Sequence, residues 1–251
     1  MLSDNPMVSM EHISLSYHSP QGETKAVEDL SFSVKEGEFV SLVGPSGCGK
    51  STLLSLLAGL MKPSQGTLSI HGKVGYMLQR DQLLPWRTIR QNALLGPEVS
   101  GKITQQDKDT VDQMLKKYDL WEFRDHYPAE LSGGMRQRVA LIRTLAIHPA
   151  VLLLDEPFSA LDYQTRLSVS DDIGRIIRQE KKTALLVTHD ISEAISLSDR
   201  VIVLSSRPAK VKQIFDICLT VPHHSVILAR EAPEFPEYFN RIWKELNQDA
   251  Q

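Results

Sequence analysis

The chain has 251 residues, of which 41% are hydrophobic, and its 28 basic and 31 acidic side chains give a formal net charge of −3. This length is enough for one large domain with a substantial core. Nucleic-acid binding usually needs a basic domain or a basic stripe, whereas the net charge of this chain is slightly negative. We therefore expect no nucleic-acid partner. Two cysteines far apart in the chain predict neither a disulfide framework nor a metal site, which is typical of a reduced, cytosolic protein.

The first part of the chain has the pattern of β-strands. Short apolar runs at residues 10–17, 30–34 and 39–43 are bounded by polar or Gly/Pro turns. The third run enters a glycine-rich loop, which is followed by the helical pattern STLLSLLAGL. A strand, a glycine-rich loop and a helix in this order are the setting of a phosphate-binding loop.

The middle of the chain, from about residue 80 to 148, predicts a helical insertion. The apolar residues of one helix face recur at i, i+3, i+4 and i+7: Val111, Met114, Leu115 and Tyr118. Afterwards the short apolar runs VLLLD, TALLVTHD and RVIVLSS alternate with helix-like stretches. This alternation is typical of a mostly parallel sheet covered by helices, so the sequence predicts an α/β fold. No stretch approaches the roughly 18 consecutive apolar residues of a spanning helix, so any work at a membrane would depend on a partner.

The tail contains proline breaks at Pro222, Pro233 and Pro236. Apolar residues then recur at helical spacing: Phe235, Phe239, Ile242, Trp243 and Leu246. We interpret residues 232–251 as an amphipathic helix packed on the surface of a domain that spans residues 7–231, rather than as a separate docking element.

Residues 44–51, with the sequence GPSGCGKS, fit the phosphate-loop pattern G-x-x-x-x-G-K-[ST]. In such a loop the backbone N–H groups wrap the phosphates, the lysine neutralises their charge and the hydroxyl binds Mg²⁺. Cys48 lies inside the loop, and we interpret it as a small packing residue, with a redox switch as the alternative. The predicted nucleotide contacts are Gly44, Pro45, Ser46, Gly47, Cys48, Gly49, Lys50, Ser51 and Thr52.

The strand pattern VLLLDEP at residues 151–157 ends in two adjacent carboxylates. Adjacent strand residues point in different directions, so the two side chains can take different roles. We expect Asp155 to hold Mg²⁺ and Glu156 to act as the general base toward an attacking water. The alternative is a solvated pair at the end of a strand.

A lone histidine, His189, ends the apolar run TALLVTHD. Such a residue is often structural or exposed to solvent. Open parallel sheets, however, place ligand-binding residues at the carboxyl ends of their strands. The order of phosphate loop, carboxylate strand and histidine strand therefore favours a role for His189 in the same site.

Together these motifs resemble those of the ATP-binding subunit of an ABC transporter. GPSGCGKST, LQRDQLLPW, LSGGMRQR, VLLLDEP, SALD and VTHD occur in the family's order. The resemblance implies a RecA-like P-loop NTPase core, an N-terminal antiparallel β subdomain, an inserted helical subdomain and the ligands ATP and Mg²⁺. It also implies a peripheral ATPase on the cytoplasmic face of the cell membrane, which works as a homodimer with transmembrane permease subunits and indirectly with a solute-binding protein.

The resemblance assigns roles to single residues. Tyr17 matches the aromatic residue that stacks on adenine, and Gln79 matches the glutamine that contacts Mg²⁺ and the attacking water. The other matches are Ser132, Gly133 and Gly134 for the signature turn, Asp162 for communication across the dimer and His189 for the γ-phosphate contact. In a head-to-tail pair, the signature turn of one copy would face the phosphate held by Lys50 of the other. The structural alternatives are a core tyrosine, a surface glutamine, a helix N-cap serine and a turn aspartate.

Residues 83–88, LLPWRT, and the tail are similar to the nitrate/sulfonate/taurine importer group, which implies a small anionic solute. Where that group often has a basic, proline-containing segment, this chain has His223-His224-Ser225, which we interpret as a surface loop because no nearby Cys or carboxylate completes a metal set. The alternatives are an importer ATPase for a pyrimidine or thiamine precursor, a soluble ABC-type ATPase acting on nucleic acid or ribosomes, and a P-loop kinase.

Overall fold

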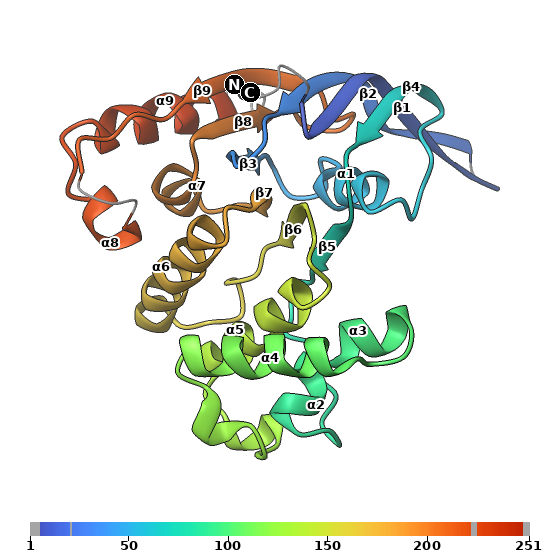
Figure 1. Ribbon diagram of the computed structural model, residues 1–251. Coiled ribbons are helices and arrows are strands. Elements are labelled where there is room, and N and C mark those ends of the chain that lie inside the picture. Colours follow the sequence, from blue (N-terminus) through green and yellow to red (C-terminus); the bar gives the residue numbers. More distant parts are fainter. Residues whose placement is uncertain (1–5, 21, 222–224, 248–251) are drawn as a thin grey trace.

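The apolar runs of the sequence form two β-sheets, as Figure 1 shows for the computed structural model, which describes residues 6–20, 22–221 and 225–247. One sheet has the strand order β2-β1-β4 and is antiparallel, and the other has the order β5-β6-β7-β3-β8-β9. The strands are β1 (Val8–Ser19), β2 (Gly22–Val34), β3 (Phe39–Val43), β4 (Gln65–Ile70), β5 (Val74–Met77), β6 (Val151–Asp155), β7 (Thr183–Thr188), β8 (Arg200–Leu204) and β9 (Val211–Asp216).

The larger sheet is parallel from β5 to β8, and β9 pairs with β8 in the antiparallel direction. Every residue of β3 and of β7 is buried. Strands covered on both faces have this continuous apolar character, since helices or a second sheet exclude water from each side. The α/β fold expected from the sequence, with its antiparallel β subdomain, is therefore confirmed.

Helices cover the larger sheet and also form a separate layer between β5 and β6 in the chain. This layer holds α2 to α5 and lies below the sheets in Figure 1. The helical elements are α1 (Lys50–Leu57), α2 (Ile89–Ala93), α3 (Leu95–Ser100), α4 (Gln105–Lys117), the 3₁₀ turns Trp121–Phe123 and Pro128–Glu130, α5 (Gly133–Leu145), α6 (Tyr163–Gln179), α7 (Ile191–Leu197), α8 (Val226–Ala229) and α9 (Phe235–Asn247).

The apolar face expected around Val111 forms on α4. Val111 and Leu115 are fully buried, Tyr118 is nearly so, and Met114 packs against the same core cluster. The helix begins with a capping box, in which the Thr104 hydroxyl accepts from the backbone N–H of the third helical residue. The helical spacing of the apolar residues and the capping box together explain where this helix forms. Its buried face attaches the helical layer to the core.

A single buried side chain orders the loop in front of α2. Asn92 is fully buried, and its Oδ1 accepts from the Leu84 N–H at 2.7 Å. Its Nδ2 donates to the carbonyl oxygens of Leu84, Arg87 and Thr88 at 3.1, 3.0 and 3.0 Å. The loop therefore has a fixed backbone, although Trp86 within it is 71% exposed.

The C-terminal stripe forms α9, which begins at Phe235 rather than at residue 232. Phe235 and Ile242 are buried against β8, β9 and α7, and Phe239 and Leu246 pack beside them. Trp243 is an exception to the expected buried stripe, because it is 56% exposed and stacks on Phe239. Pro222, the His223-His224 pair and residues 248–251 lie outside the described residues.

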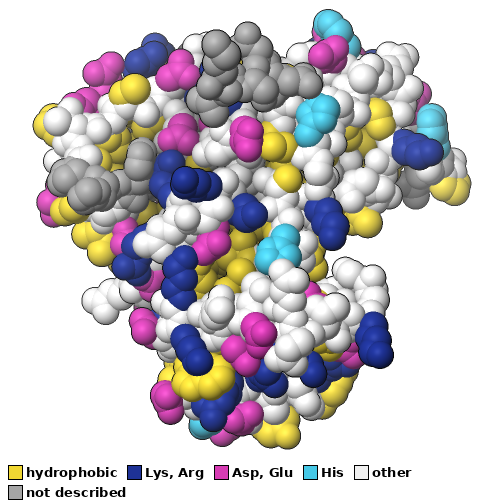
Figure 2. All heavy atoms as spheres, viewed as in Figure 1, with side chains coloured by type: hydrophobic (Ala, Val, Ile, Leu, Met, Phe, Trp, Pro, Cys, Tyr) yellow, Lys and Arg dark blue, Asp and Glu magenta, His cyan; other side chains and the backbone are white. Residues whose placement is uncertain are grey.

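The exposed surface mixes both signs of charge. Figure 2 shows Lys and Arg side chains interspersed with Asp and Glu over this face of the sheets and of the helical layer. Within the described ranges, no helix has the length and apolar character needed to cross a membrane.

Candidate active site

Four neighbouring strands bring several of the predicted site residues to one edge of the larger sheet. The strands β5, β6, β7 and β3 are adjacent and parallel, with Val43 opposite Thr188 and Asp155 opposite Val187. The carboxyl ends of these strands therefore meet at the same edge, where open parallel sheets bind their ligands. The residues that end or follow these strands are Gln79, Asp155, Glu156, His189 and the loop that starts at Gly44.

The phosphate loop connects β3 to α1 through two glycines with left-handed backbones. Gly47 has φ of 75° and Gly49 has φ of 123°, and a Cβ on Gly49 would lie 2.8 Å from the Ala26 carbonyl oxygen. Only glycine fits there without strain. Lys50 is 7% exposed, and its Nζ donates to the carbonyl oxygens of Gly44 and Pro45 at 2.7 and 2.9 Å, so the ammonium lies within the loop.

Tyr17 of β1 contacts Thr52 in the first turn of α1. The Tyr17 hydroxyl is 3.0 Å from Thr52 Oγ1. Tyr17 is 40% exposed, so it is not part of the buried core, and its ring stands beside the start of α1. Cys48, inside the loop, is 1% exposed, and burial raises the pKa of its thiol.

The two adjacent carboxylates contact different neighbours. The Tyr76 hydroxyl donates to Asp155 Oδ2 at 3.0 Å, whereas Glu156 Oε2 is 2.9 Å from His189 Nδ1. Burial raises the pKa of Asp155, while the Tyr76 hydrogen bond opposes this rise. A carboxylate that burial disfavours in its charged form is stabilised by a nearby cation.

The residues present fit a metal–nucleotide complex better than a metal held by the protein alone. In the part of the chain that the structure describes, no group of three or more His, Cys, Asp or Glu residues could hold a metal ion. Mg²⁺ usually keeps one or two protein ligands and takes its other ligands from water and phosphate oxygens. Ser51 at the start of α1 and Asp155 at the end of β6 are donors of this kind.

Ser159 connects Gln79 to the backbone of Glu156, a link that the sequence did not predict. Gln79 Nε2 donates to Ser159 Oγ at 3.3 Å, and that hydroxyl donates to the Glu156 carbonyl oxygen at 3.0 Å. Glu156 has φ of 42°, which is uncommon outside glycine, and its N–H donates to the Val187 carbonyl oxygen at 2.9 Å. The only signal for Ser159 was its position in the motif SALD. Tyr76, which donates a hydrogen bond to Asp155, belongs to no motif that the sequence analysis singled out.

The signature turn lies at the start of α5, whereas the phosphate loop lies before α1. Ser132 is the N-cap of α5 and accepts from the Met135 N–H at 3.3 Å, as the structural alternative expected. A Cβ on Gly133 would lie 2.9 Å from Leu161, the neighbour of Asp162, which in turn caps α6. Among the described residues, no hydrogen bond or ion pair joins this turn to the phosphate loop.

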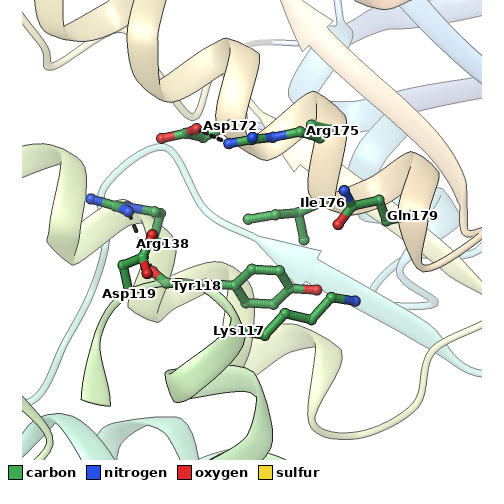
Figure 3. Close-up of a pocket in the computed structure, with 8 residues that line it drawn as sticks. All are labelled: Lys117, Tyr118, Asp119, Arg138, Asp172, Arg175, Ile176 and Gln179. Carbon is green, nitrogen blue, oxygen red and sulfur yellow. Dashed lines mark hydrogen bonds and ion pairs between the residues drawn. The ribbon is translucent and has the colours of Figure 1, made fainter. Parts of the chain in front are cut away.

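A polar pocket of about 210 Å³ lies elsewhere, between the end of α4, α5 and α6 (Figure 3). Several of its polar groups contact other groups of the same chain. Lys117 Nζ and the Tyr118 hydroxyl contact Glu180 Oε1 at 2.6 and 2.7 Å, and Arg175 pairs with Asp172. The contacts of Lys117 and Tyr118 with Glu180 attach the end of α4 to the end of α6, whereas the Arg175–Asp172 pair lies within α6. We therefore interpret this pocket as a structural junction.

Comparisons with known proteins agree with this geometry. The ABC transporter family model matches residues 27–159. The chain is 46% identical to an uncharacterized ABC transporter ATP-binding protein, YtlC, of Bacillus subtilis over 95% of each chain. It is 40% identical to the nitrate import ATP-binding protein NrtD of Synechocystis over 88% of each chain. It is also 44% identical to the aliphatic sulfonates import ATP-binding protein SsuB 1 of Pseudomonas savastanoi pv. phaseolicola, over 78% of this chain and 81% of that one.

A solved structure agrees as well. A dimeric ATP-binding cassette in a post-hydrolysis state, bound to ADP and Pi, matches with a TM-score of 0.71 and 30% identity. The match covers 84% of this chain and 99% of the cassette. With its phosphate loop, its paired carboxylates and these relatives, the chain belongs to the ABC transporter family and is one of its ATP-binding, ATP-hydrolysing subunits.

Proposed function

We propose that the protein is the ATPase subunit of an importer for a small anionic solute of the sulfonate, taurine or nitrate type, and that it works at the cytoplasmic face of the cell membrane. The import relatives for nitrate and for aliphatic sulfonates support this class of solute. The observation that carries the ATPase assignment is the contact of 2.9 Å between Glu156 and His189, at the sheet edge where the phosphate loop begins.

We assign the residues that bind ATP and Mg²⁺ from their positions around that edge of the sheet. The loop from Gly44 to Thr52 would hold the phosphates, with Lys50 as the cation, and Tyr17 would stack on the adenine. Ser51, Asp155 and Gln79 would hold Mg²⁺, which when bound neutralises charge on the β- and γ-phosphates. Burial of Asp155 supports its role because a cation offsets the cost of its charge.

Glu156 would act as the general base. Its carboxylate would accept a proton from the attacking water as the water oxygen bonds to the γ-phosphorus and the bond from that phosphorus to the ADP oxygen breaks, which releases ADP and phosphate. His189 Nδ1 lies against this carboxylate, so the ring is oriented by Glu156 and would contact the γ-phosphate through its other nitrogen. Ser159 supports the placement of Gln79, because its hydroxyl touches both the Gln79 side chain and the Glu156 backbone.

The complete site would need two copies of the chain. In the part of the chain that the structure describes, Ser132, Gly133 and Gly134 make no hydrogen bond or ion pair with the phosphate loop, and a related cassette is dimeric. Two copies arranged head to tail would bring each turn to the γ-phosphate held by the other copy, and Asp162 would lie near the shared boundary. Permease subunits would bind the helical layer, and a solute-binding protein would supply the cargo.

The Glu156→Gln variant tests the ATPase assignment. It should keep its affinity for ATP and lose about a hundred- to ten-thousand-fold in turnover, because a general base contributes about that factor. Nucleotide binding and phosphate release should be measured on the same preparation, with the exposed Glu122→Gln as the control. Turnover close to that of the parent would remove Glu156 from this role.

The solute is tested through the partners. Purification of the chain with its co-encoded permease should yield a complex whose ATPase is stimulated by a binding protein loaded with taurine, an alkyl sulfonate or nitrate. Stimulation by a pyrimidine or thiamine precursor alone would favour that importer class. Recovery with ribosomes or nucleic acid, and without a permease, would contradict the proposal.

A further inference from the structure

The segment that carries Gln79 has no helix or strand of its own. Residues 78–88 connect β5 to α2 as an irregular loop. Asn92 orders the second half of this loop through its four hydrogen bonds. The first half, which follows Gln79 directly, is held by a different element, the helix α5.

Two arginines of α5 make these contacts. Arg143 Nη2 donates to the Asp81 carbonyl oxygen and its Nη1 donates to the Gln82 carbonyl oxygen, both at 2.7 Å. Arg136 Nε donates to Asp81 Oδ2 at 3.0 Å, while Asp81 Oδ1 accepts from the Leu83 N–H at 3.1 Å. The arginines are seven residues apart, close to two helical turns, so they lie on the same face of α5.

Arg136 also contacts the start of the signature turn. Its Nη1 donates to the carbonyl oxygen of Leu131, the residue before Ser132, at 2.6 Å. One guanidinium therefore touches both the loop after Gln79 and the backbone that leads into the turn. Asp81 and Gly133 also line the same cavity, of about 330 Å³, so loop and turn are neighbours in space. The planar fork of arginine can hold two acceptors at fixed angles, which a lysine ammonium cannot do.

We infer that Arg136 and Arg143 are positioning residues that make the loop after Gln79 and the turn Ser132-Gly133-Gly134 one rigid unit. This inference rests on the proposed function, in which Gln79 meets the nucleotide of its own chain and the turn meets that of the second copy. If the loop and the turn form a rigid unit, the approach of Gln79 to its nucleotide and the approach of the turn to the other nucleotide occur in one movement. Closure of the Gln79 loop on one nucleotide then places the turn against the other.

Arg136→Gln should leave ATP binding by single chains unchanged and weaken ATP-dependent self-association by about tenfold. The variant loses a charge-assisted hydrogen bond to Asp81 and a second bond to the Leu131 carbonyl oxygen. The side chains of Arg136 and Asp81 are 34% and 28% exposed, so solvent reduces the effect of the ion pair. Asp81→Asn should weaken self-association by a similar factor, and the double variant should be no weaker than either single one.

Arg90 provides a matched control. Its side chain pairs with Asp112 through two contacts of 2.6 and 2.8 Å, within the same helical layer. The side chains of this pair are 34% and 21% exposed, close to those of Arg136 and Asp81. Among the described residues, the Arg90 side chain makes no hydrogen bond or ion pair with the loop after Gln79 or with the turn. Arg90→Gln should therefore lower thermal stability about as much as Arg136→Gln does and leave self-association unchanged.

The experiment uses the full chain with Glu156→Gln as the parent, so that bound ATP persists. Self-association is measured by sedimentation velocity over a range of ATP concentrations, and single-chain binding with a fluorescent ATP analogue at low protein concentration. Thermal melting reports folding. If Arg136→Gln does not fold, Arg136→Lys and Arg143→Lys replace it, because each keeps the charge and loses the forked contact.

Selective loss of self-association in the Arg136 and Asp81 variants, without additivity, would support the inference. Association equal to the parent's in those variants, or an equal loss in Arg90→Gln, would overturn it while leaving the proposed function intact. Failure of the parent itself to associate when ATP is added would instead overturn the shared site, and with it the inference.

Discussion

Glu193 allows a quantitative test of the environment around His189. This residue of α7 is 4% exposed, and its Oε2 accepts from Thr188 Oγ1 at 2.8 Å. Burial raises the pKa of Glu193 from 4.5 to about 7. The Thr188 hydrogen bond and the charges of Arg166 and His189 act in the opposite direction, whereas Asp190 adds to the rise.

Proton linkage determines whether Glu193 raises or lowers the unfolding free energy as the pH changes. The folded protein binds the proton on Glu193 more tightly than the unfolded chain does, so the stabilisation is fully present below about pH 4.5 and is lost as the pH rises through about 7. At about 1.4 kcal/mol for each tenfold change in proton affinity, the rise from 4.5 to about 7 corresponds to about 3 kcal/mol of unfolding free energy.

Glu193→Gln should remove this dependence, because glutamine is neutral throughout and can still accept from Thr188. Urea unfolding at about pH 5 and about pH 8 should show the variant gaining up to about 3 kcal/mol relative to the parent at the higher pH. Glu122→Gln, the same change at an exposed position, should gain far less. Equal pH dependence of unfolding in the parent and in Glu193→Gln would refute the reasoning.

Two further results are expected. Ser132→Arg should abolish ATP turnover while single chains still bind ATP, because the bulky cation would occupy the turn that faces the second nucleotide. Phosphate release measures turnover, and nucleotide binding is measured on single chains. Retained turnover would contradict a shared site. Iodoacetamide should modify Cys218 well before Cys48 in the folded protein, because Cys48 is 1% exposed with a raised pKa and Cys218 is exposed. Peptide mass spectrometry reports the two rates, and equal rates would contradict the burial of Cys48.

Local patterns predicted those parts of the fold that depend on neighbours in the chain. Apolar runs predicted β1, β2, β3, β6, β7 and β8, but β4, β5 and β9 were not predicted. The 3.6-residue period predicted α4, and the glycine pattern predicted the turn between β3 and α1. The carboxyl-edge rule also predicts that Glu156 and His189 lie at the same edge of the sheet. Their contact at 2.9 Å agrees with that expectation.

Contacts between distant segments could not be predicted in this way. Arg136 and Asp81 are 55 residues apart, and no spacing rule relates them. The exposure of Trp243 was missed for a related reason, since helical period tells which residues share a face but not how far the neighbouring elements extend over it. The left-handed backbone at Glu156 depends on the Val187 carbonyl of another strand.

The buried amide of Asn92 has a consequence for recognition. Its four hydrogen bonds fix the backbone of residues 84–88 when the chain folds, although Trp86 remains exposed to water. Ordering a loop on binding opposes association by about 1 to 2 kcal/mol of backbone entropy for each residue fixed. Because this loop is already ordered in the folded chain, its ordering would not oppose binding. Most of the free energy gained by burying the Trp86 indole against a partner would then contribute to affinity.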